Sequence, residues 1–167
     1  MYTIQDICDS LSNDTNIINH LFDKIPTKEE WIFEYRPNPD QRSLKELLEY
    51  MSLMWRMIAT ITKSVTYDQE ELAKVRGANE GLNVEEDFKT LMTSQLKFVT
   101  SSLKELSEND LSAEIDPFGK WAMQRKMFIL NTLLKTYTAY RMQLFLYLKD
   151  SGQRHLNTSN VWMWQDA

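Results

Sequence analysis

The sequence predicts an all-α protein built as a four-helix bundle. Four long segments place apolar residues three, four and seven positions apart, which is the spacing of one face of an α-helix. Only four glycines and four prolines occur in 167 residues, so few positions interrupt a long helix. Three short stretches also carry Ser, Thr or Asn three residues before Glu, the capping-box pattern of helix starts. Together these features favour packed helices over a sheet.

The first helix is expected over residues 3–24, and Pro26 ends it because proline cannot donate the helical hydrogen bond. Asp14 lies along its apolar stripe, near the middle. The stripe consists of Ile4, Ile7, Cys8, Leu11, Ile18, Leu21, Phe22 and Ile25.

The second helix is expected over residues 43–65, because a capping box (Ser43 and Glu46) precedes a strong stripe. Pro37 and Pro39 force an extended or turning path before it. The stripe consists of Leu44, Leu47, Leu48, Met51, Met54, Trp55, Ile58, Thr62 and Val65. A short helix near residues 68–75 is expected in the connection that follows.

The third helix is expected over residues 84–106, after a capping box formed by Asn83 and Glu86. Gln95 and Ser102 interrupt its apolar face, which carries Phe88, Leu91, Met92, Phe98, Val99, Leu103 and Leu106. The polar stretch before Gly119 then leads to the last helix.

The last helix is expected over residues 120–151, with Gly152 as a left-handed cap at its end. Arg141 falls near the centre of its apolar face, between Leu130 and Leu134 on a helical wheel. The face consists of Met127, Leu130, Leu134, Tyr137, Leu144, Phe145 and Leu148. Residues 152–167 form a tail, and residues 1–167 are expected to form one domain.

The loop lengths predict an up-down-down-up path. The first and third connections suit antiparallel neighbours, whereas residues 66–83 are long enough to cross the bundle and return the third helix parallel to the second.

Composition excludes several classes of function. The net charge of −5 argues against nucleic acid as a partner, although residues 120–167 carry +5 and residues 1–119 carry −10. That basic last segment either complements its acidic neighbours or meets an acidic partner. No leader and no membrane span are expected, and the lone Cys8 suits a reducing compartment, so the sequence predicts a cytoplasmic protein.

Two stretches resemble the DinB/YfiT-like superfamily. Residues 39–50 (PDQRSLKELLEY) resemble the start of that family's second helix, with a Pro-rich approach, Arg-Ser and Glu-Leu-Leu. Residues 140–152 (YRMQLFLYLKDSG) resemble its last-helix motif. The resemblance implies an up-down-down-up bundle, often dimeric, in which three His residues bind a divalent metal. It also implies chemistry with low-molecular-weight thiols, or hydrolysis, in some members.

The chain departs from this family at the three ligand positions. Tyr50, Thr136 and Tyr140 stand where the resemblance implies histidines, and neither His20 nor His155 is placed to restore the triad. A phenol or a hydroxyl is a poor ligand for zinc or nickel at neutral pH. We therefore expect no metal and no cofactor.

The face between the second and last helices has two interpretations, a ligand-binding cleft or ordinary core packing. The candidates for a ligand-binding cleft are Tyr50, Thr136, Tyr137, Tyr140 and Arg141, although aromatic residues at helical spacing are also ordinary core residues. A buried Arg141 must find acceptors, which predicts a polar layer with Asp14 or Gln95, and with Tyr50 as a third candidate.

The sequence favours a metal-free small-ligand-binding or structural protein over an enzyme. The alternative is a thiol-dependent transferase or hydrolase that uses the same cleft. A homodimer is expected, because the apolar tail with Trp162 and Trp164 must pack either on its own bundle or on a neighbouring subunit.

Overall fold

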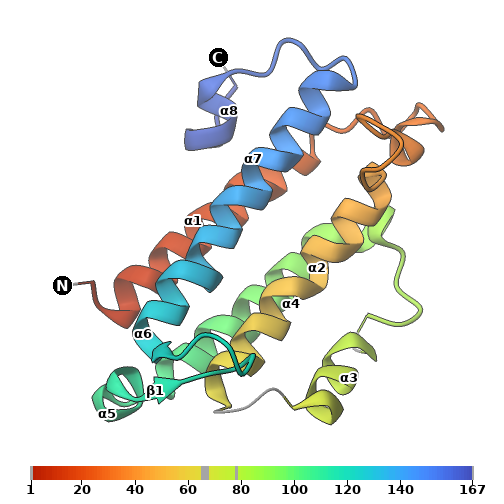
Figure 1. Cartoon of the computed structure of the whole chain (residues 1–167). Helices are drawn as coiled ribbons and strands as arrows, with labels where there is room; N and C mark the ends of the chain where they lie inside the picture. The colour runs from red at the N-terminus through yellow and green to blue at the C-terminus, as the bar shows by residue number, and fades with distance from the viewer. Residues whose placement is uncertain (1, 65–67, 78, 167) are drawn as a thin grey trace.

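Four long helical columns make up the protein in a computed structural model, which describes residues 2–64, 68–77 and 79–166. Three columns are single helices, α1 (Ile4–Phe22), α2 (Leu44–Lys63) and α4 (Val84–Lys104). The fourth is continuous through α6 (Arg125–Phe128), the π-helical segment η2 (Ile129–Leu134) and α7 (Lys135–Asp150). Figure 1 shows α7 beside α1, and α2 beside α4.

Short elements join and cover these columns. The 3₁₀ turn η1 (Ile32–Glu34) precedes α2, and α3 (Gln69–Gly77) lies in the connection to α4. Between α4 and α6 lie α5 (Glu108–Ser112) and two short strands, β1 (Glu114–Ile115) and β2 (Met123–Gln124). The chain then ends with α8 (Thr158–Met163), which packs on α1 and α7.

The bundle has the predicted up-down-down-up path. Ion pairs join Lys45 to Glu85 and Lys63 to Glu105, so α2 and α4 run parallel. Asp23 pairs with Lys89 at the start of α4, so α1 and α4 run antiparallel. Contacts between α2 and α7 run in opposite directions along the two helices, from Tyr50 with Tyr140 to Trp55 with Thr136.

The first three predicted helices lie within two residues of the observed ends, apart from residue 65, which lies outside the described residues. Ser43 and Glu46 form the predicted capping box. Asn83 also caps its helix, but the prediction of Glu86 as its reciprocal partner was wrong. The backbone N–H of Asn83 donates to Asp87 instead, at 3.0 Å, because that carboxylate lies one residue further along the first turn.

The last helix begins later than predicted. Residues 120–124 do not continue it, because the chain pairs Glu114 with Gln124 and Ile115 with Met123 in an antiparallel hairpin. Asp116 stabilises the turn by accepting from the backbone N–H groups of residues 120 and 121. Gly119 takes a positive φ of 66°, which costs glycine little. The helix therefore starts at Arg125.

The buried face of the last helix also differs from the predicted one. Met127 is 41% exposed, whereas Phe128 and Ile129 are buried. The buried positions through η2 fall four residues apart, at Ile129, Leu133, Tyr137 and Arg141. In a regular α-helix, side chains four residues apart differ in direction by about 40°, because each turn holds 3.6 residues. A π turn holds more residues than an α turn, so side chains spaced in this way stay closer to one direction. The π segment therefore keeps these side chains on one face.

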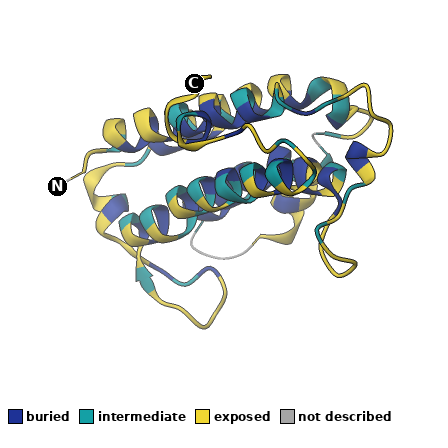
Figure 2. Ribbon diagram, turned by 90° about the horizontal axis from the view of Figure 1, so that it is seen from above, coloured by how far each residue is buried: buried dark blue, intermediate teal, exposed yellow. Residues whose placement is uncertain are grey.

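One hydrophobic core runs through the bundle from Ile7 to Leu156. Its largest fully buried side chains come from three of the four columns, namely Trp55 (α2), Phe88 (α4), and Phe128 (α6) with Tyr137 (α7) from the last column. Figure 2 shows buried segments on the long helices facing one another, with exposed residues on the outer faces. Among the described residues, no helix is long and apolar enough to cross a membrane.

Candidate functional site

Aromatic rings meet where α2 faces α7. The indole of Trp55 stacks on the phenol of Tyr137, with centroids 3.9 Å apart. Tyr140 approaches Trp55 edge-on at 6.4 Å and lies 5.3 Å from Tyr50. Edge-on and offset contacts of this kind are favourable packing geometries. We call Tyr50, Trp55, Tyr137 and Tyr140 the aromatic cluster.

Thr136 completes the set of predicted cleft residues around this cluster. Its Oγ1 accepts from the indole Nε1 of Trp55 at 3.1 Å. The same hydroxyl lies 2.6 Å from the carbonyl oxygen of Thr132, to which it donates. Thr136 therefore satisfies a buried indole and the carbonyl of the preceding turn, and its hydroxyl is engaged on both sides.

Tyr50, Thr136 and Tyr140, which stand where the resemblance implies histidines, carry side chains that are not usual ligands of a divalent metal. Burial, followed by the neighbouring phenol of Tyr140, raises the pKa of Tyr50, so its phenolate is disfavoured at neutral pH. The guanidinium of Arg42 lies 4.3 Å from the Tyr50 ring centroid and would oppose a cation there. Thr136 is engaged as described above. Across the described parts of the chain, no cluster of three or more His, Cys, Asp or Glu side chains could hold a metal ion.

Arg141 lies in a second polar site, between α1 and α7. Its side chain is almost fully buried and donates to the Asp14 carboxylate, which also accepts from Thr138 Oγ1 at 3.3 Å. The ring of Trp162 in α8 covers the guanidinium at 4.4 Å. Burial raises the pKa of Asp14, and the charge of Arg141 opposes that rise.

Gln95 does not share this layer. Its amide lies between α4 and α2, where Oε1 accepts from the backbone N–H of Arg56 at 3.0 Å and Nε2 donates to the carbonyl of Met51 at 2.9 Å. Tyr50 likewise contacts Tyr140 and Arg42. Of the predicted layer, the structure brings together Asp14 and Arg141, while Gln95 lies at a different helix pair.

A cavity of about 770 Å³ opens at the end of the bundle where α1 begins. We call it the N-terminal cavity. Apolar side chains from α1, α5 and the last column, and from the residues after α4, form much of its wall, including Ile4, Ile7, Leu106, Leu111, Met127 and Leu130. Lys104, Lys126 and Glu108 add charge to the lining.

Sequence reasoning missed this cavity, although a signal was present. Ile4, Leu106 and Leu130 belong to the predicted apolar stripes, yet they are only partly buried. Met127, also on a predicted stripe, is exposed. These four residues are the ends of stripes that the neighbouring helices do not cover, and they converge because α1 and the last column (at α6) begin where α4 ends.

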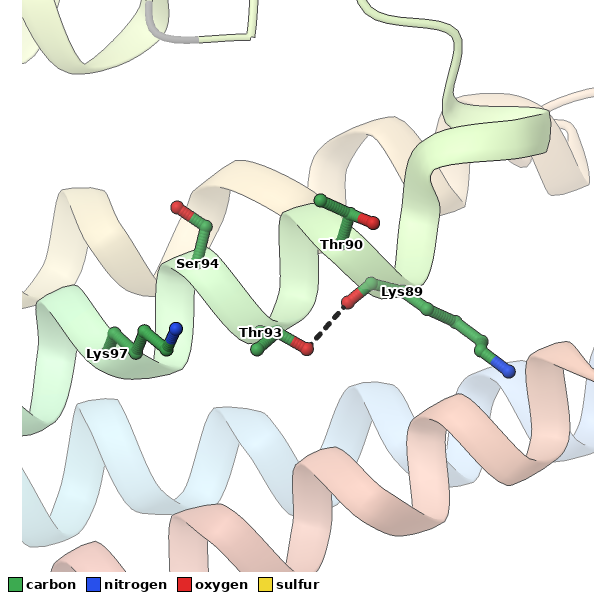
Figure 3. A pocket seen from close by; sticks show the side chains of 5 residues that line it. All are labelled: Lys89, Thr90, Thr93, Ser94 and Lys97. Atoms are coloured by element: carbon green, nitrogen blue, oxygen red, sulfur yellow. Dashed lines mark hydrogen bonds between the residues drawn. The ribbon is translucent and has the colours of Figure 1, made fainter.

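A second depression lies on the outer face of α4, and Figure 3 shows its five side chains. All five are polar, and all come from one helix: Lys89, Thr90, Thr93, Ser94 and Lys97. Thr93 Oγ1 donates to the carbonyl of Lys89, and the Lys89 ammonium pairs with Asp23. Two of its polar groups thus serve the protein itself, and the depression, formed by one helix, does not enclose a ligand.

The comparisons with known proteins agree with this architecture. No family model matches the sequence, and no curated protein matches it. Among solved structures, the chain is similar in fold to a DinB-like protein. One similar structure is the crystal structure of a DinB-like protein, YjoA from Bacillus subtilis, with a TM-score of 0.65. The aligned region covers 87% of this chain and 92% of YjoA, at 20% sequence identity. The DinB-like fold expected from residues 39–50 and 140–152 is therefore confirmed.

Proposed function

We propose that this protein is a metal-free DinB-like bundle that binds a small apolar ligand in the N-terminal cavity. The observation that carries the proposal is the cavity itself, about 770 Å³ in volume and walled largely by Ile, Leu and Met side chains. Ligand sites in proteins have this size and this predominantly apolar character, with a few polar groups that set orientation.

The packing between α2 and α7 supports a structural role for the aromatic cluster. Trp55 and Tyr137 are fully buried and stacked, and Tyr140 closes on both Trp55 and Tyr50. Rings in such contact occupy the space that a ligand would need. A ligand cleft at Tyr50, Thr136, Tyr137, Tyr140 and Arg141, or an enzyme that uses it, stays a prediction from sequence.

Binding of a neutral fluorescent probe such as N-phenyl-1-naphthylamine tests the cavity. Met127 is 41% exposed and lines the cavity, so Met127→Trp fills it without disturbing the core. We expect the wild type to bind with a dissociation constant in roughly the micromolar range and Met127→Trp to weaken binding about tenfold or more.

Leu82→Trp is the matched control, because Leu82 is 50% exposed and lies outside the cavity lining. It should bind the probe as the wild type does. Absence of wild-type binding, or equal binding by Met127→Trp, would overturn the proposal.

The proposed absence of a resident metal has its own test. The side chains of Tyr50, Thr136 and Tyr140 support it, for the reasons given above. Protein purified without a tag should contain zinc and nickel well below one ion per chain by elemental analysis. A stoichiometric ion that is lost on Tyr140→Phe would contradict this proposal.

We also propose a cytoplasmic homodimer. Burial raises the pKa of the lone Cys8 thiol, so that it stays protonated and unreactive, as suits a reducing compartment. The tail supports the dimer, because Trp162, Met163 and Trp164 are 43–51% exposed although α8 packs on its own bundle. Half-exposed aromatic clusters of this kind are typical of contact surfaces.

A further inference from the structure

We infer that the ligand of the N-terminal cavity is an amphipathic carboxylate, an apolar chain with one anionic head group; this inference rests on the proposed function. It comes from the charges in the cavity lining, which the apolar wall alone does not explain. Lys104 approaches from the last turn of α4 and Lys126 from α6. Two cations from separate columns therefore line one apolar space.

Neither of these two lysines has an acidic partner in the part of the chain that the structure describes, whereas four other lysines do. The ammonium groups of Lys24, Lys45, Lys63 and Lys89 each lie 2.6–2.8 Å from a carboxylate oxygen. Within the described ranges, neither Lys104 nor Lys126 has a carboxylate within ion-pair distance. Glu108 lines the same cavity, yet it too lies beyond 4 Å from both ammonium groups.

The position of Lys104 is favourable for α4 itself, because a cation in the last turn of a helix complements the negative end of the helix dipole. The position of Lys126 has no such advantage. It lies in the first turn of the last column, where the positive end of the helix disfavours a cation. A carboxylate at the mouth of the cavity would offset that unfavourable placement.

The apolar wall of the cavity indicates the rest of the ligand, a hydrocarbon chain. Ile4, Ile7, Leu106 and Leu130 present aliphatic side chains without a hydrogen-bonding group. Such a surface gains from covering a hydrocarbon chain and would leave polar groups of a ligand unpaired. An aliphatic chain against this wall, with its carboxylate beside Lys104 and Lys126, satisfies both parts of the site.

Three ligands with the same chain and different head groups test the inference by isothermal titration calorimetry, each below its micelle concentration. They are decanoate, decanol and decylammonium. We expect decanoate to bind most tightly and decylammonium most weakly. Lys104→Met and Lys126→Met should each weaken decanoate binding about threefold, the size of an exposed ion pair, and leave decanol binding unchanged. Added salt should weaken decanoate binding and leave decanol binding unchanged.

The controls separate this inference from the proposed function. Lys97→Met removes an exposed α4 lysine outside the cavity and should change nothing. Equal binding of decanoate and decanol, or decanoate binding insensitive to both lysine variants, would overturn the carboxylate head group while the cavity function stands. If the wild type binds none of the three ligands, the proposed function fails as well. Met127→Trp should weaken binding of decanoate and decanol alike.

Discussion

Asp14 and Arg141 form a buried ion pair. We expect this pair to specify how α1 and α7 align, and to add little to the free energy of unfolding. Both side chains are almost fully removed from water. The rise in the Asp14 pKa reflects the cost of desolvating its charge, which the attraction to Arg141 only partly offsets. The pair joins α1 to α7, so a slip of either helix would separate two buried charges. We therefore expect the pair to fix the register of these helices.

Removing one partner should cost far more than removing both. Asp14→Ala leaves Arg141 charged and unpaired, which costs about 3–5 kcal/mol for a fully buried pair. In the Arg141→Met background the same substitution should cost much less, because no buried charge remains to be satisfied. Denaturant unfolding of the two single variants and the double variant measures the coupling. Additive free energies of unfolding would show that the pair does not act as a unit.

Tyr35 provides a second residue-scale prediction, on pH dependence. Burial, and then its hydrogen bond to the Asp150 carboxylate, raise the pKa of Tyr35 to about 12. An unfolded tyrosine ionises near pH 10, at roughly its reference value. The folded protein therefore holds this proton where the unfolded chain has lost it, and stability should fall as the pH rises from about 10 to 12.

Absorbance titration of tyrosinate should show this group directly. The difference between the wild-type and Tyr35→Phe curves should have its midpoint near pH 12. Asp150→Asn serves as the control, because it removes the charge and should move the midpoint part of the way back toward the ordinary value. A difference curve centred near the ordinary tyrosine value would contradict the prediction.

Among the secondary-structure elements, the π segment η2 has the largest effect on which side chains the last column buries. A π turn holds one extra residue between two α-helical stretches that stay in register with each other. Here it lets α6 bury Phe128 while α7 buries Tyr137 and Arg141. Asn131, within this segment, is exposed and carries no part of the core.

Deletion of Asn131 should therefore be tolerated. The segment would become α-helical, and the flanking stretches would keep their buried faces. Deletion of Ala139, an exposed residue in the regular part of α7, is the matched control. It would rotate one half of the column by about 100° relative to the other and expose core side chains. Thermal unfolding by circular dichroism should show a cooperative transition near that of the wild type for the first deletion only. Equal loss of stability in both variants would refute this interpretation of η2.

At the scale of the whole molecule, the exposed tail is the feature that supports the proposed dimer. α8 is anchored by Leu156 and Val161, which are buried, and by Asn160, whose amide contacts His20. Met163 and Trp164 lie beyond this anchor and remain about half exposed. The tail thus docks on its own bundle through one face and presents an apolar face outward.

Substitution of the outward face should give a monomer. Light scattering of the wild type, at concentrations on the order of tens of micromolar, should give twice the 19.8 kDa chain mass. The double variant Met163→Ser with Trp164→Ser should give the mass of one chain. Trp121→Ser, at a 70% exposed position on the β1–β2 hairpin, should leave the dimer intact. A monomeric wild type would remove the dimer proposal.

The sequence could predict the helices and their order because periodic burial and caps are local properties. Each stripe and the Ser43 capping box act within one segment. The loop lengths favoured the up-down-down-up path, which the structure has. Sequence also indicated that Arg141 must find an acceptor, because a guanidinium cannot lose its charge when buried.

Only the tertiary structure decided which surfaces were left uncovered. The hairpin that delays the last helix depends on pairing between residues 114–115 and 123–124, and propensity cannot fix such pairing at a distance. The offset that buries Phe128 in place of Met127 accompanies the π turn, which the apolar spacing of the sequence did not predict. The N-terminal cavity exists because three stripes end together without a covering element. A stripe determines which side chains avoid water, whereas the relative placement of helix ends determines whether the protein itself covers them.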